Sequence, residues 1–560
     1  MTVELDIVER KNEENLKLSK QMSDTMKKLN IDGNEPIAPI DADLDTAATT
    51  TTTTTIHANS GPSTDLQRFY AGKNVFITGG TGFLGKTLVD KLLRSCPDVE
   101  NIYLLVRPKK GVDIHTRLEE IFDENAFSRL RETVPKFRHK IVAIAGDCSL
   151  AGLGMKINDR QTLISNVDIV FHCAATVRFD EKLRLAVSIN VHGTRELLEL
   201  CTHMQHLQVV MHVSTAYSNC HLRFIEEKFY NYPFHFDDLS RLIDKLDDKA
   251  LDNITPTLLG KWPNTYAFTK ALSEDLIRMN GKNLPLGMFR PAIVTSSVHE
   301  PVVGYIDNLY GPTGVVAGAG TGVLRTMHCN PDISANIVPV DMTVNALIAS
   351  AWDVATNNKD ACIAEDVPIY NYVSSVENPL TWGEFTDKNI RNGFTYPFST
   401  AIWYVSFHMH KTAFMNRVYM VFLHLLPALF MDLLTMCVGQ RPRMLKMYKK
   451  IHKFSSVISF FCTNEWMFTN SNVQRLWKKI GRRDQELFDF NIRNVDWDEY
   501  SHHYIKGMRL HLFKDDLSTL ESARKKWNRF YWMHQILKAI LALTVLHTAW
   551  AIFSYFFYSF

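Results

Sequence analysis

The stretch from Lys73 to Gly111 reads KNVFITGGTGFLGKTLVDKLLRSCPDVENIYLLVRPKKG, and it decides the fold. A short, apolar and β-prone run over 75–77 leads into a cluster of glycines between 79 and 85. Leucines then recur at helical spacing over 84–93, and a second apolar run follows over 102–106. Strand, glycine turn, helix and second strand come in the order of a βαβ unit, so the stretch predicts two parallel strands joined by a helix.

The glycine turn predicts a dinucleotide site. Only glycine lets the backbone turn this sharply and approach a pyrophosphate, and the N-terminus of the following helix offers free N–H groups. Two overlapping patterns fit: one begins at Gly79 with a glycine every third residue, and one begins at Gly80 and matches G-x-G-x-x-G. The pattern alone does not choose between them. The expected cofactor-binding residues of this loop are Thr78, Gly79, Gly80, Thr81, Gly82, Phe83, Leu84 and Gly85.

The end of the second strand indicates which nicotinamide cofactor is used. An acidic residue there would accept hydrogen bonds from the ribose of NAD, whereas this chain has Arg107, Lys109 and Lys110. The basic residues favour NADPH, and Arg107, directly at the strand end, is the expected phosphate contact. A solvated basic loop is the alternative interpretation of the two lysines.

The composition is that of a large globular protein with more than one domain. The chain has 560 residues, 46% of them hydrophobic, and a formal net charge of +2, so no nucleic-acid partner is expected. Its nine cysteines form no C-x-x-C pair, which argues against a disulfide framework or a structural metal site and favours the cytosol. Residues 1–63 include a threonine run over 49–55 and no long apolar segment, so we expect a disordered tail without a signal peptide.

Further apolar runs extend the predicted sheet. Segments 141–145 and 167–171 indicate buried strands separated by helices, which predicts a Rossmann-type, doubly wound parallel sheet. Asp147 and Ala174 follow these strands at the carboxyl edge, where open α/β sheets bind ligands. Asp147 is expected either to contact the adenine or to serve as an ordinary turn residue. Ala174 is small enough for the cofactor to lie close, and His172 is expected to be a packing residue.

A tyrosine and a lysine supply the candidate chemistry. The apolar run over 209–213 delivers Thr215 to the same edge, and Tyr266 and Lys270 lie four residues apart at the start of a predicted helix, on one face. A phenol is a weak acid at neutral pH, and an adjacent cation stabilises its phenolate, which eases proton donation to a developing alkoxide. Thr215 can supply a second hydrogen bond to that oxygen.

With the glycine turn, these residues resemble the extended short-chain dehydrogenase/reductase superfamily, in which such a Tyr, Lys and Ser or Thr act on a carbonyl beside a nicotinamide. The resemblance implies catalytic roles for Thr215, Tyr266 and Lys270. It also implies that Tyr266 and Lys270 lie at the cofactor, with Lys270 on the nicotinamide ribose. The segment 290–294 reads RPAIV, and a similar turn contacts the nicotinamide end in that superfamily, which adds Pro291 to the expected cofactor-binding residues.

Two more motifs narrow the resemblance. GYIDNLYGPTG over 304–314 and NIVPVD over 336–341, with HVSTAY and YAFTKALSE, are similar to fatty acyl-CoA reductases. The similarity covers about 73–515, with 430–515 resembling their C-terminal male sterility domain. It implies NADPH-dependent reduction of a long-chain fatty acyl-CoA to a fatty alcohol. From the residues alone, the glycine and proline punctuation over 304–314 predicts only loops where a substrate cap would sit.

Three other interpretations of these motifs stay open. The glycine loop and the Tyr/Lys pair also occur in membrane-bound steroid 3β-hydroxy dehydrogenase/isomerases, but 304–314 and the long C-terminal part argue against that. A sugar-nucleotide epimerase fits less well. A catalytically silent NADP-binding scaffold is the third, and the intact set of Thr215, Tyr266 and Lys270 argues against it.

Two apolar segments suggest a membrane. The run over 418–431 lacks Asp, Glu, Lys and Arg, but it is shorter than the ~20 residues of a spanning helix and contains Pro427. It is expected to be a membrane-dipping or acyl-channel helix, or a buried helix of the second domain. The segment 539–560 is long enough to span. Basic residues precede it and none follows, so a cytosolic catalytic domain with a C-terminal anchor is expected, in the endoplasmic reticulum first and the peroxisomal membrane second. A buried C-terminal helix is the alternative.

The expected organisation is therefore a disordered tail, a reductase domain, a linking segment, a helical C-terminal domain, a basic juxtamembrane helix and a transmembrane helix. These cover 1–63, 64–369, 370–429, 430–515, 516–538 and 539–560.

Overall fold

The computed structural model describes residues 63–109, 111–232, 235–281, 283–357 and 367–558. The N-terminal tail expected over 1–63 lies, apart from Ser63, outside the described residues.

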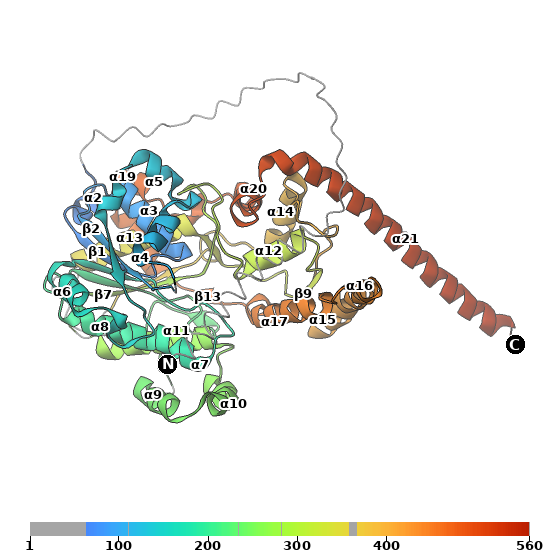
Figure 1. The fold of residues 1–560 in the computed structure, drawn as a ribbon, viewed down its shortest axis with the longest axis horizontal. Coiled ribbons are helices and arrows are strands. Elements are labelled where there is room, and N and C mark those ends of the chain that lie inside the picture. Colours follow the sequence, from blue (N-terminus) through green and yellow to red (C-terminus); the bar gives the residue numbers. More distant parts are fainter. Residues whose placement is uncertain (1–62, 110, 233–234, 282, 358–366, 559–560) are drawn as a thin grey trace, which may run out of the picture.

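A seven-stranded sheet forms the centre of the molecule, in the order β3-β2-β1-β4-β5-β7-β11, and every neighbouring pair is parallel (Figure 1). The strands are β1 Asn74–Thr78, β2 Asn101–Val106, β3 Ile141–Ala145, β4 Ile169–His172, β5 Val209–Val213, β7 Leu286–Pro291 and β11 Ile369–Tyr372. The order reverses between β1 and β4, as in doubly wound dinucleotide-binding sheets. The predicted fold class is confirmed.

Helices cover both faces of the sheet, because successive strand residues point to opposite sides. Val75 and Ile77 of β1 share a core cluster with Leu88 of helix α3 (Phe83–Ser95) and with helix α13 (Val340–Asn357). Phe76, between them, belongs to a second cluster on the other face. That face is covered by α6 (Ile157–Asn166), α8 (Gly193–Thr202) and α11 (Thr265–Asn280).

The remaining elements surround this unit. The shorter helices before residue 300 are α2 Asp65–Tyr70, α4 Ile114–Phe122, α5 Ser128–Thr133, α7 Leu183–Val187, α9 Phe236–Lys245 and α10 Asp248–Leu259. Later helices are α12 Pro312–Gly320, α14 Trp382–Thr395, α15 Ala413–Met420, α16 Leu426–Cys437, α17 Met444–Thr463, α18 Ser471–Lys479, α19 Arg482–Leu487, α20 Trp497–Gly507 and α21 Leu520–Tyr558. Short parallel pairs join β8 Ile293–Thr295 to β10 Ile337–Pro339, β9 Thr326–His328 to β12 His408–His410, and β6 Phe224–Ile225 to β13 Met467–Phe468.

The C-terminal region packs tightly on the sheet unit. A Cβ on Gly507 of α20 would lie 1.8 Å from the carbonyl oxygen of Gly304, so the two backbones touch. Tyr500 of α20 hydrogen-bonds the hydroxyl of Thr295 at 2.7 Å. The block 304–314 is thus the surface on which α20 rests. Strand β11 crosses the boundary expected between residues 369 and 370, because its hydrogen bonds to β7 make it the edge of the large sheet.

The apolar run over 418–431 belongs to a longer helix than the sequence suggested. Helix α15, a π-helical turn over 421–425 and α16 form one 25-residue helix, Ala413–Cys437, which is long and apolar enough to cross a membrane. Pro427 does not end it: a π-helical turn precedes the proline, and local adjustments of this kind let a helix continue through a missing N–H group. The helix is not a buried one: Phe422 is 63% and Phe430 61% exposed.

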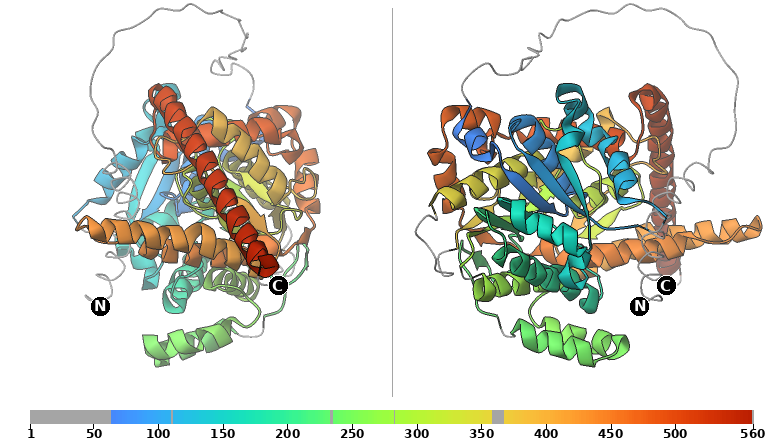
Figure 2. Two further views of the ribbon diagram at one scale, coloured as in Figure 1. Left: turned by 90° about the vertical axis from the view of Figure 1, so that its right-hand side faces the viewer. Right: turned by 60° about the vertical axis from the view of Figure 1, so that its left-hand side comes forward.

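Helix α21 is the second candidate for a membrane span among the described residues. It runs for 39 residues, and none of its most apolar part is buried in the structure, so the alternative of a buried C-terminal helix does not hold. Basic residues of 516–538 and the apolar segment after them form one continuous helix. Figure 2 shows that α21 and the α15–α16 helix project from the same side of the molecule.

Candidate active site

The parallel register brings the expected site residues to one edge of the sheet. Strands β1, β4, β5 and β7 stand next to one another or one strand apart, and their carboxyl ends carry the glycine loop, Ala174, Thr215 and Pro291. The N–H group of Ala216 donates to the carbonyl of Pro291 at 2.9 Å, which ties the loops after β5 and β7 together.

The glycine loop is built on Gly79, Gly82 and Gly85. Gly79 has a φ of +74°, and a Cβ there would lie 2.7 Å from the backbone nitrogen of Ala174. A Cβ on Gly85 would lie 2.2 Å from the carbonyl oxygen of Gly79. At Gly80 the nearest atom is only the flexible tip of Leu104. The geometry therefore favours the pattern with a glycine every third residue.

The N-terminus of α3 fits a pyrophosphate. Gly82 is the N-cap, is exposed and provides no capping side chain, so the first amides of the helix have no oxygen from a cap residue. A Cβ on Gly82 would meet only the carbonyl oxygen of Gly79. Open space in front of free helix amides is the arrangement that binds phosphate groups. Thr81, Phe83 and Leu84 lie half-buried beside it.

Thr78, Ala174 and His172 form the floor of this loop. The Thr78 hydroxyl is hydrogen-bonded to Nδ1 of His172 at 2.7 Å and accepts from the N–H of Ala174 at 3.3 Å. His172 also contacts the Thr194 hydroxyl at 3.0 Å, and burial lowers the pKa of His172 to about 3, so its ring is neutral. Thr78 therefore holds the loop after β4 in place, and His172 packs as expected.

Two arginines meet at the end of β2. Arg107 is exposed, and its carbonyl oxygen accepts a hydrogen bond from the guanidinium of Arg117 on α4. Burial and repulsion from Arg107 lower the pKa of Arg117, and neither side chain forms an ion pair with a carboxylate among the described residues. Glu120 is the acidic neighbour of Arg117, but repulsion from Arg107 outweighs its effect on the Arg117 pKa. Two neighbouring cations at the end of β2 fit an anion. The sequence analysis missed Arg117, because only the fold of α4 brings it back to β2.

Asp147, by contrast, is engaged locally. Its Oδ1 accepts hydrogen bonds from the backbone N–H of Ser149 at 2.9 Å and from the Ser149 hydroxyl at 2.8 Å. This is the turn role that the sequence left open for it.

Thr215 and Tyr266 face each other. Tyr266 lies in the first turn of α11, which Asn264 caps through a 2.8 Å hydrogen bond to the N–H of Ala267. Burial raises the pKa of Tyr266 to about 12, and the neighbouring Thr215 hydroxyl only partly offsets this. The phenol is therefore fully protonated at neutral pH and can act as a proton donor.

Lys270 lies beneath the tyrosine, one turn further along α11. It is 2% exposed, and its Nζ donates to the carbonyl of Val213 at 2.8 Å. Burial lowers the pKa of Lys270 to about 8. The expected lowering of the phenol pKa by this cation is not seen, because Lys270 is directed to the end of β5 and burial dominates the pKa of Tyr266.

A buried ion pair supports the catalytic helix. Glu274, one turn after Lys270, pairs with Arg290 of β7 at 2.6 Å, and it also accepts from the Ser214 hydroxyl at 2.6 Å. The sequence analysis missed this pair. The spacing of Tyr266, Lys270 and Glu274 places all three on one helical face, but nothing local identifies Arg290 as the partner.

Family models and curated relatives identify the family of this chain. The family described as male sterility protein matches residues 77–347 with its NAD-binding model, and its second model matches 423–515. Fatty acyl-CoA reductase wat of Drosophila melanogaster is 43% identical over 489 residues, covering 87% of this chain and 93% of that protein. Fatty acyl-CoA reductase 1 of Homo sapiens is 37% identical over 491 residues, with the same two coverages of 87% and 93%. Fatty acyl-CoA reductase 2 of Homo sapiens is 34% identical, covering 85% of this chain and 92% of the relative.

Solved structures share the fold. The reductase domain of a non-ribosomal peptide synthetase from Mycobacterium tuberculosis superposes with a TM-score of 0.52 at 19% identity, covering 80% of this chain and 95% of that one. The terminal reductase domain of the myxalamid pathway gives a TM-score of 0.50 at 16% identity, with coverages of 79% and 92%. With relatives this similar over almost their whole length, the chain belongs to the fatty acyl-CoA reductase family.

Proposed function

We propose that this enzyme reduces a long-chain fatty acyl-CoA to the primary alcohol and free CoA, consuming two NADPH in two rounds at one site. The observation that carries the proposal is the juxtaposition of Thr215 and Tyr266 at the sheet edge where the glycine loop opens. The relatives' names supply the substrate class.

The described residues fit NADPH in particular. The free amides of α3 suit the pyrophosphate, and the paired guanidinium groups of Arg107 and Arg117 suit a ribose 2′-phosphate, which NADH lacks. Asp147, Ala174 and Pro291 would line the adenine and nicotinamide ends, and Lys270 would hold the nicotinamide ribose. The bound cofactor supplies a hydride to the carbonyl carbon.

In the first round the protein positions and protonates the thioester oxygen. Thr215 and Tyr266 donate hydrogen bonds to that oxygen, which stabilises the negative charge that develops on it. Tyr266 then transfers its phenolic proton to the oxygen, and Lys270, in its ammonium form, turns from the Val213 carbonyl toward the phenolate and compensates the charge left there. The hemithioacetal that results then collapses: the C–S bond breaks, the hydroxyl proton passes to the leaving sulfur, CoA departs as the free thiol, and an aldehyde remains.

In the second round the same groups act on the aldehyde. Tyr266, reprotonated, again donates to the carbonyl oxygen, and the product is the alcohol. Two hydrides and two protons are consumed in all, a four-electron reduction. No covalent acyl-enzyme is required.

We also propose that α21 anchors the enzyme with the catalytic part in the cytosol. Five basic residues directly precede the apolar part of the helix, and cytosolic flanks of membrane spans are enriched in Lys and Arg: Arg524, Lys525, Lys526, Arg529 and Lys538. The endoplasmic reticulum is the first choice of membrane, and the peroxisomal membrane is the second.

Product analysis tests the proposed reaction. Membranes that contain the full chain are incubated with palmitoyl- or stearoyl-CoA and NADPH, and fatty alcohol is measured by mass spectrometry. We expect alcohol from wild type and a loss of about 10²- to 10⁴-fold in Tyr266→Phe, which keeps the ring but removes the proton. Equal alcohol formation by Tyr266→Phe would refute the mechanism, and oxidation of a sterol without reduction of any acyl-CoA would refute the substrate class.

A further inference from the structure

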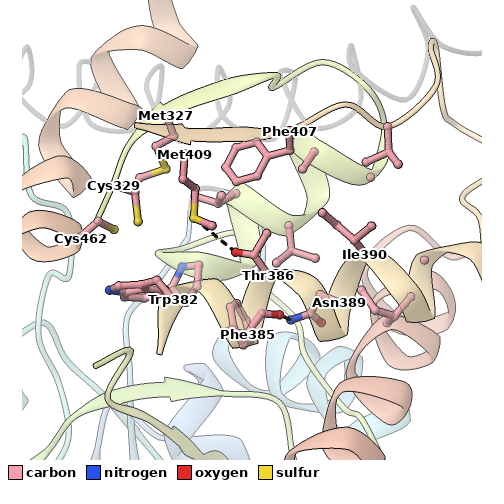
Figure 3. Close-up of a pocket in the computed structure, with 18 of the residues that line it drawn as sticks. Met327, Cys329, Trp382, Phe385, Thr386, Asn389, Ile390, Phe407, Met409 and Cys462 are labelled. Carbon is pink, nitrogen blue, oxygen red and sulfur yellow. Dashed lines mark hydrogen bonds between the residues drawn. The ribbon is translucent and has the colours of Figure 1, made fainter. Parts of the chain in front are cut away.

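An apolar cavity lies among helices that follow the catalytic helix α11 in the chain, chiefly α12, α14 and α17. The space between its walls is about 720 Å³, including the part open to solvent. Helices α12, α14 and α17 and strands β9 and β12 supply most of its wall. Figure 3 shows Met327, Met409, Phe385, Phe407 and Ile390 pointing into it. The wall therefore suits a long, apolar ligand.

One end of the cavity is joined to the catalytic tyrosine by aromatic rings. The ring of Phe179 stacks on Tyr266 with centroids 5.7 Å apart, and Phe461 of α17 lies 5.4 Å from Phe179. Ile458 and Cys462, the neighbours of Phe461 on the same helix, line the cavity. Packed aromatic rings thus link the proposed site of carbonyl reduction to the helix whose residues Ile458 and Cys462 line the cavity.

The other end is closed by the helix that leads to the proposed membrane anchor. Trp527 of α21 lines the cavity, and it packs in one small core cluster with Ala401 and Val405. Trp527 also meets the ring of Phe394 at the end of α14, with centroids 5.3 Å apart. The cavity therefore extends away from Tyr266 along α14.

We propose that this cavity holds the acyl chain of the substrate, and that the face of α14 carrying Thr386, Asn389, Ile390 and Gly393 sets the chain length. The proposal rests on the proposed function and goes further by placing the fatty tail. A thioester carbon at Tyr266 directs the chain along Phe179 and Phe461 into the cavity. The first carbons lie by α17, and the methyl end approaches Gly393 and Trp527.

Gly393 gives the sharpest probe of chain length. It lines the cavity, and a Cβ built on it meets no atom within 4 Å, so the first carbon of a side chain there lies in open space. Gly393→Phe therefore shortens the space for the chain. Ile390→Ala, one turn earlier on the same face, widens it. Arg391→Phe adds the same ring on the exposed side of α14 and is the matched control.

A substitution at Asn389 tests whether the cavity binds an acyl chain or a polar ligand. The Asn389 side chain is 4% exposed, its Nδ2 donates to the carbonyl of Phe385 at 2.7 Å, and its Oδ1 has no hydrogen-bond partner among the described residues. A polar ligand would use that oxygen, whereas an acyl chain would gain from its removal. Asn389→Leu is expected to lower the KM for stearoyl-CoA severalfold, and a rise in KM would contradict the proposal.

The test is a competition among chain lengths. Membranes with each full-length variant receive an equimolar mixture of lauroyl-, palmitoyl-, stearoyl- and behenoyl-CoA with NADPH, and the alcohols are quantified by mass spectrometry. We expect Gly393→Phe to lower the ratio of stearyl to lauryl alcohol at least about tenfold, Ile390→Ala to shift products to longer chains, and Arg391→Phe to match wild type.

The outcomes separate this inference from the proposed function. Wild type that makes no alcohol from any of the four substrates would overturn the proposed function. Active wild type whose product profile is unchanged by both Gly393→Phe and Ile390→Ala would overturn the placement of the chain alone. If Gly393→Phe does not accumulate in membranes, the profile of Ile390→Ala decides.

Discussion

Glu274 of α11 and Arg290 of β7 form an ion pair of 2.6 Å, and both side chains are fully buried. Arg290 Nε donates a second hydrogen bond to Glu274 at 2.9 Å, so the ion pair is bidentate. The pair fixes the helix that carries Tyr266 and Lys270 against the strand that ends in Pro291. The position of the catalytic tyrosine relative to the sheet therefore depends on a contact outside the site.

Breaking this pair should destabilise the enzyme strongly. Glu274→Gln leaves the Arg290 charge buried without compensation, and we expect the free energy of unfolding to fall by about 3–5 kcal/mol. Thermal and denaturant unfolding of the detergent-purified protein measures this. Glu521→Gln removes one partner of the exposed Lys525–Glu521 pair and should leave the midpoint unchanged. A Glu274→Gln protein as stable as wild type would show that the buried pair contributes nothing.

The glycine loop predicts a rank order of substitutions. Gly79→Ala forces a residue with a side chain into a φ of +74° and against the backbone at Ala174, whereas Gly80→Ala meets only the end of Leu104. We therefore expect Gly79→Ala to abolish NADPH binding and Gly80→Ala to retain it, measured by the fluorescence of the bound cofactor. The reverse order would mean that the pattern beginning at Gly80 is the functional one.

Cofactor preference should depend on two arginines rather than one. Arg107→Ala and Arg117→Ala each remove a charge-assisted contact worth about 1.5–3 kcal/mol, so each should raise the KM for NADPH about 10- to 100-fold and leave that for NADH almost unchanged. Steady-state kinetics with both cofactors is the measurement. Lys109→Ala, three residues beyond the end of β2, is the matched control. An effect confined to Lys109→Ala would move the phosphate contact to the basic loop.

Activity should decline on the alkaline side because of Lys270. Burial lowers the pKa of Lys270 to about 8, so its ammonium form is lost as the pH rises through that value, while Tyr266, with its pKa raised to about 12, stays protonated. We expect kcat/KM for palmitoyl-CoA to fall above about pH 8. Lys270→Arg keeps a positive charge at every pH tested. The activity that this variant retains should therefore not decline above pH 8.

The same lowered pKa of Lys270 has the opposite effect on stability. A loss of activity caused by Lys270 can therefore be told apart from a loss of folded protein. The folded protein holds the Lys270 proton less tightly than the unfolded chain, whose lysine has a pKa near 10.5. Between about pH 8 and 10.5 the unfolded state binds more protons, so the contribution of this group to the free energy of unfolding rises with pH. A loss of activity that tracks a loss of folded protein over this range would contradict the assignment.

A second membrane contact is expected at α15–α16. Phe422 and Phe430 are exposed, and the basic residues Arg441, Arg443, Lys446, Lys449 and Lys450 follow. A chain that ends at residue 538 should therefore still bind anionic vesicles. Adding Phe422→Asp and Phe430→Asp to this shortened chain should weaken vesicle binding about 100-fold or more. Each phenylalanine ring that enters the membrane contributes about 1.5–3 kcal/mol to the binding free energy.

Vesicle co-sedimentation measures that binding, and Ile157→Asp is the control. Ile157 is 75% exposed but belongs to α6 on the sheet unit. Complete release of the chain that ends at residue 538 would leave α21 as the only membrane contact.

The sequence by itself determined the features that depend on short-range patterns. A strand, a glycine turn and a helix follow from the residues over 73–111, because period, turn chemistry and chain length act locally. The four-residue spacing of Tyr266 and Lys270 placed both on one helical face for the same reason. The apolar segment over 539–560 predicted a membrane-spanning helix, and α21 is long and apolar enough for one.

Only the tertiary structure decided what depends on distant parts of the chain. The backbone at Ala174 shows why residue 79 must be a glycine. Helix α4 brings Arg117 back to the end of β2. The ion pair with Arg290 shows the structural role of Glu274. Contacts of this kind leave no local period, since their partners are brought together only when the strands take their order in the sheet. The cavity along α14 has the same origin, because its wall is assembled from segments between residues 312 and 527 that no short motif relates to one another.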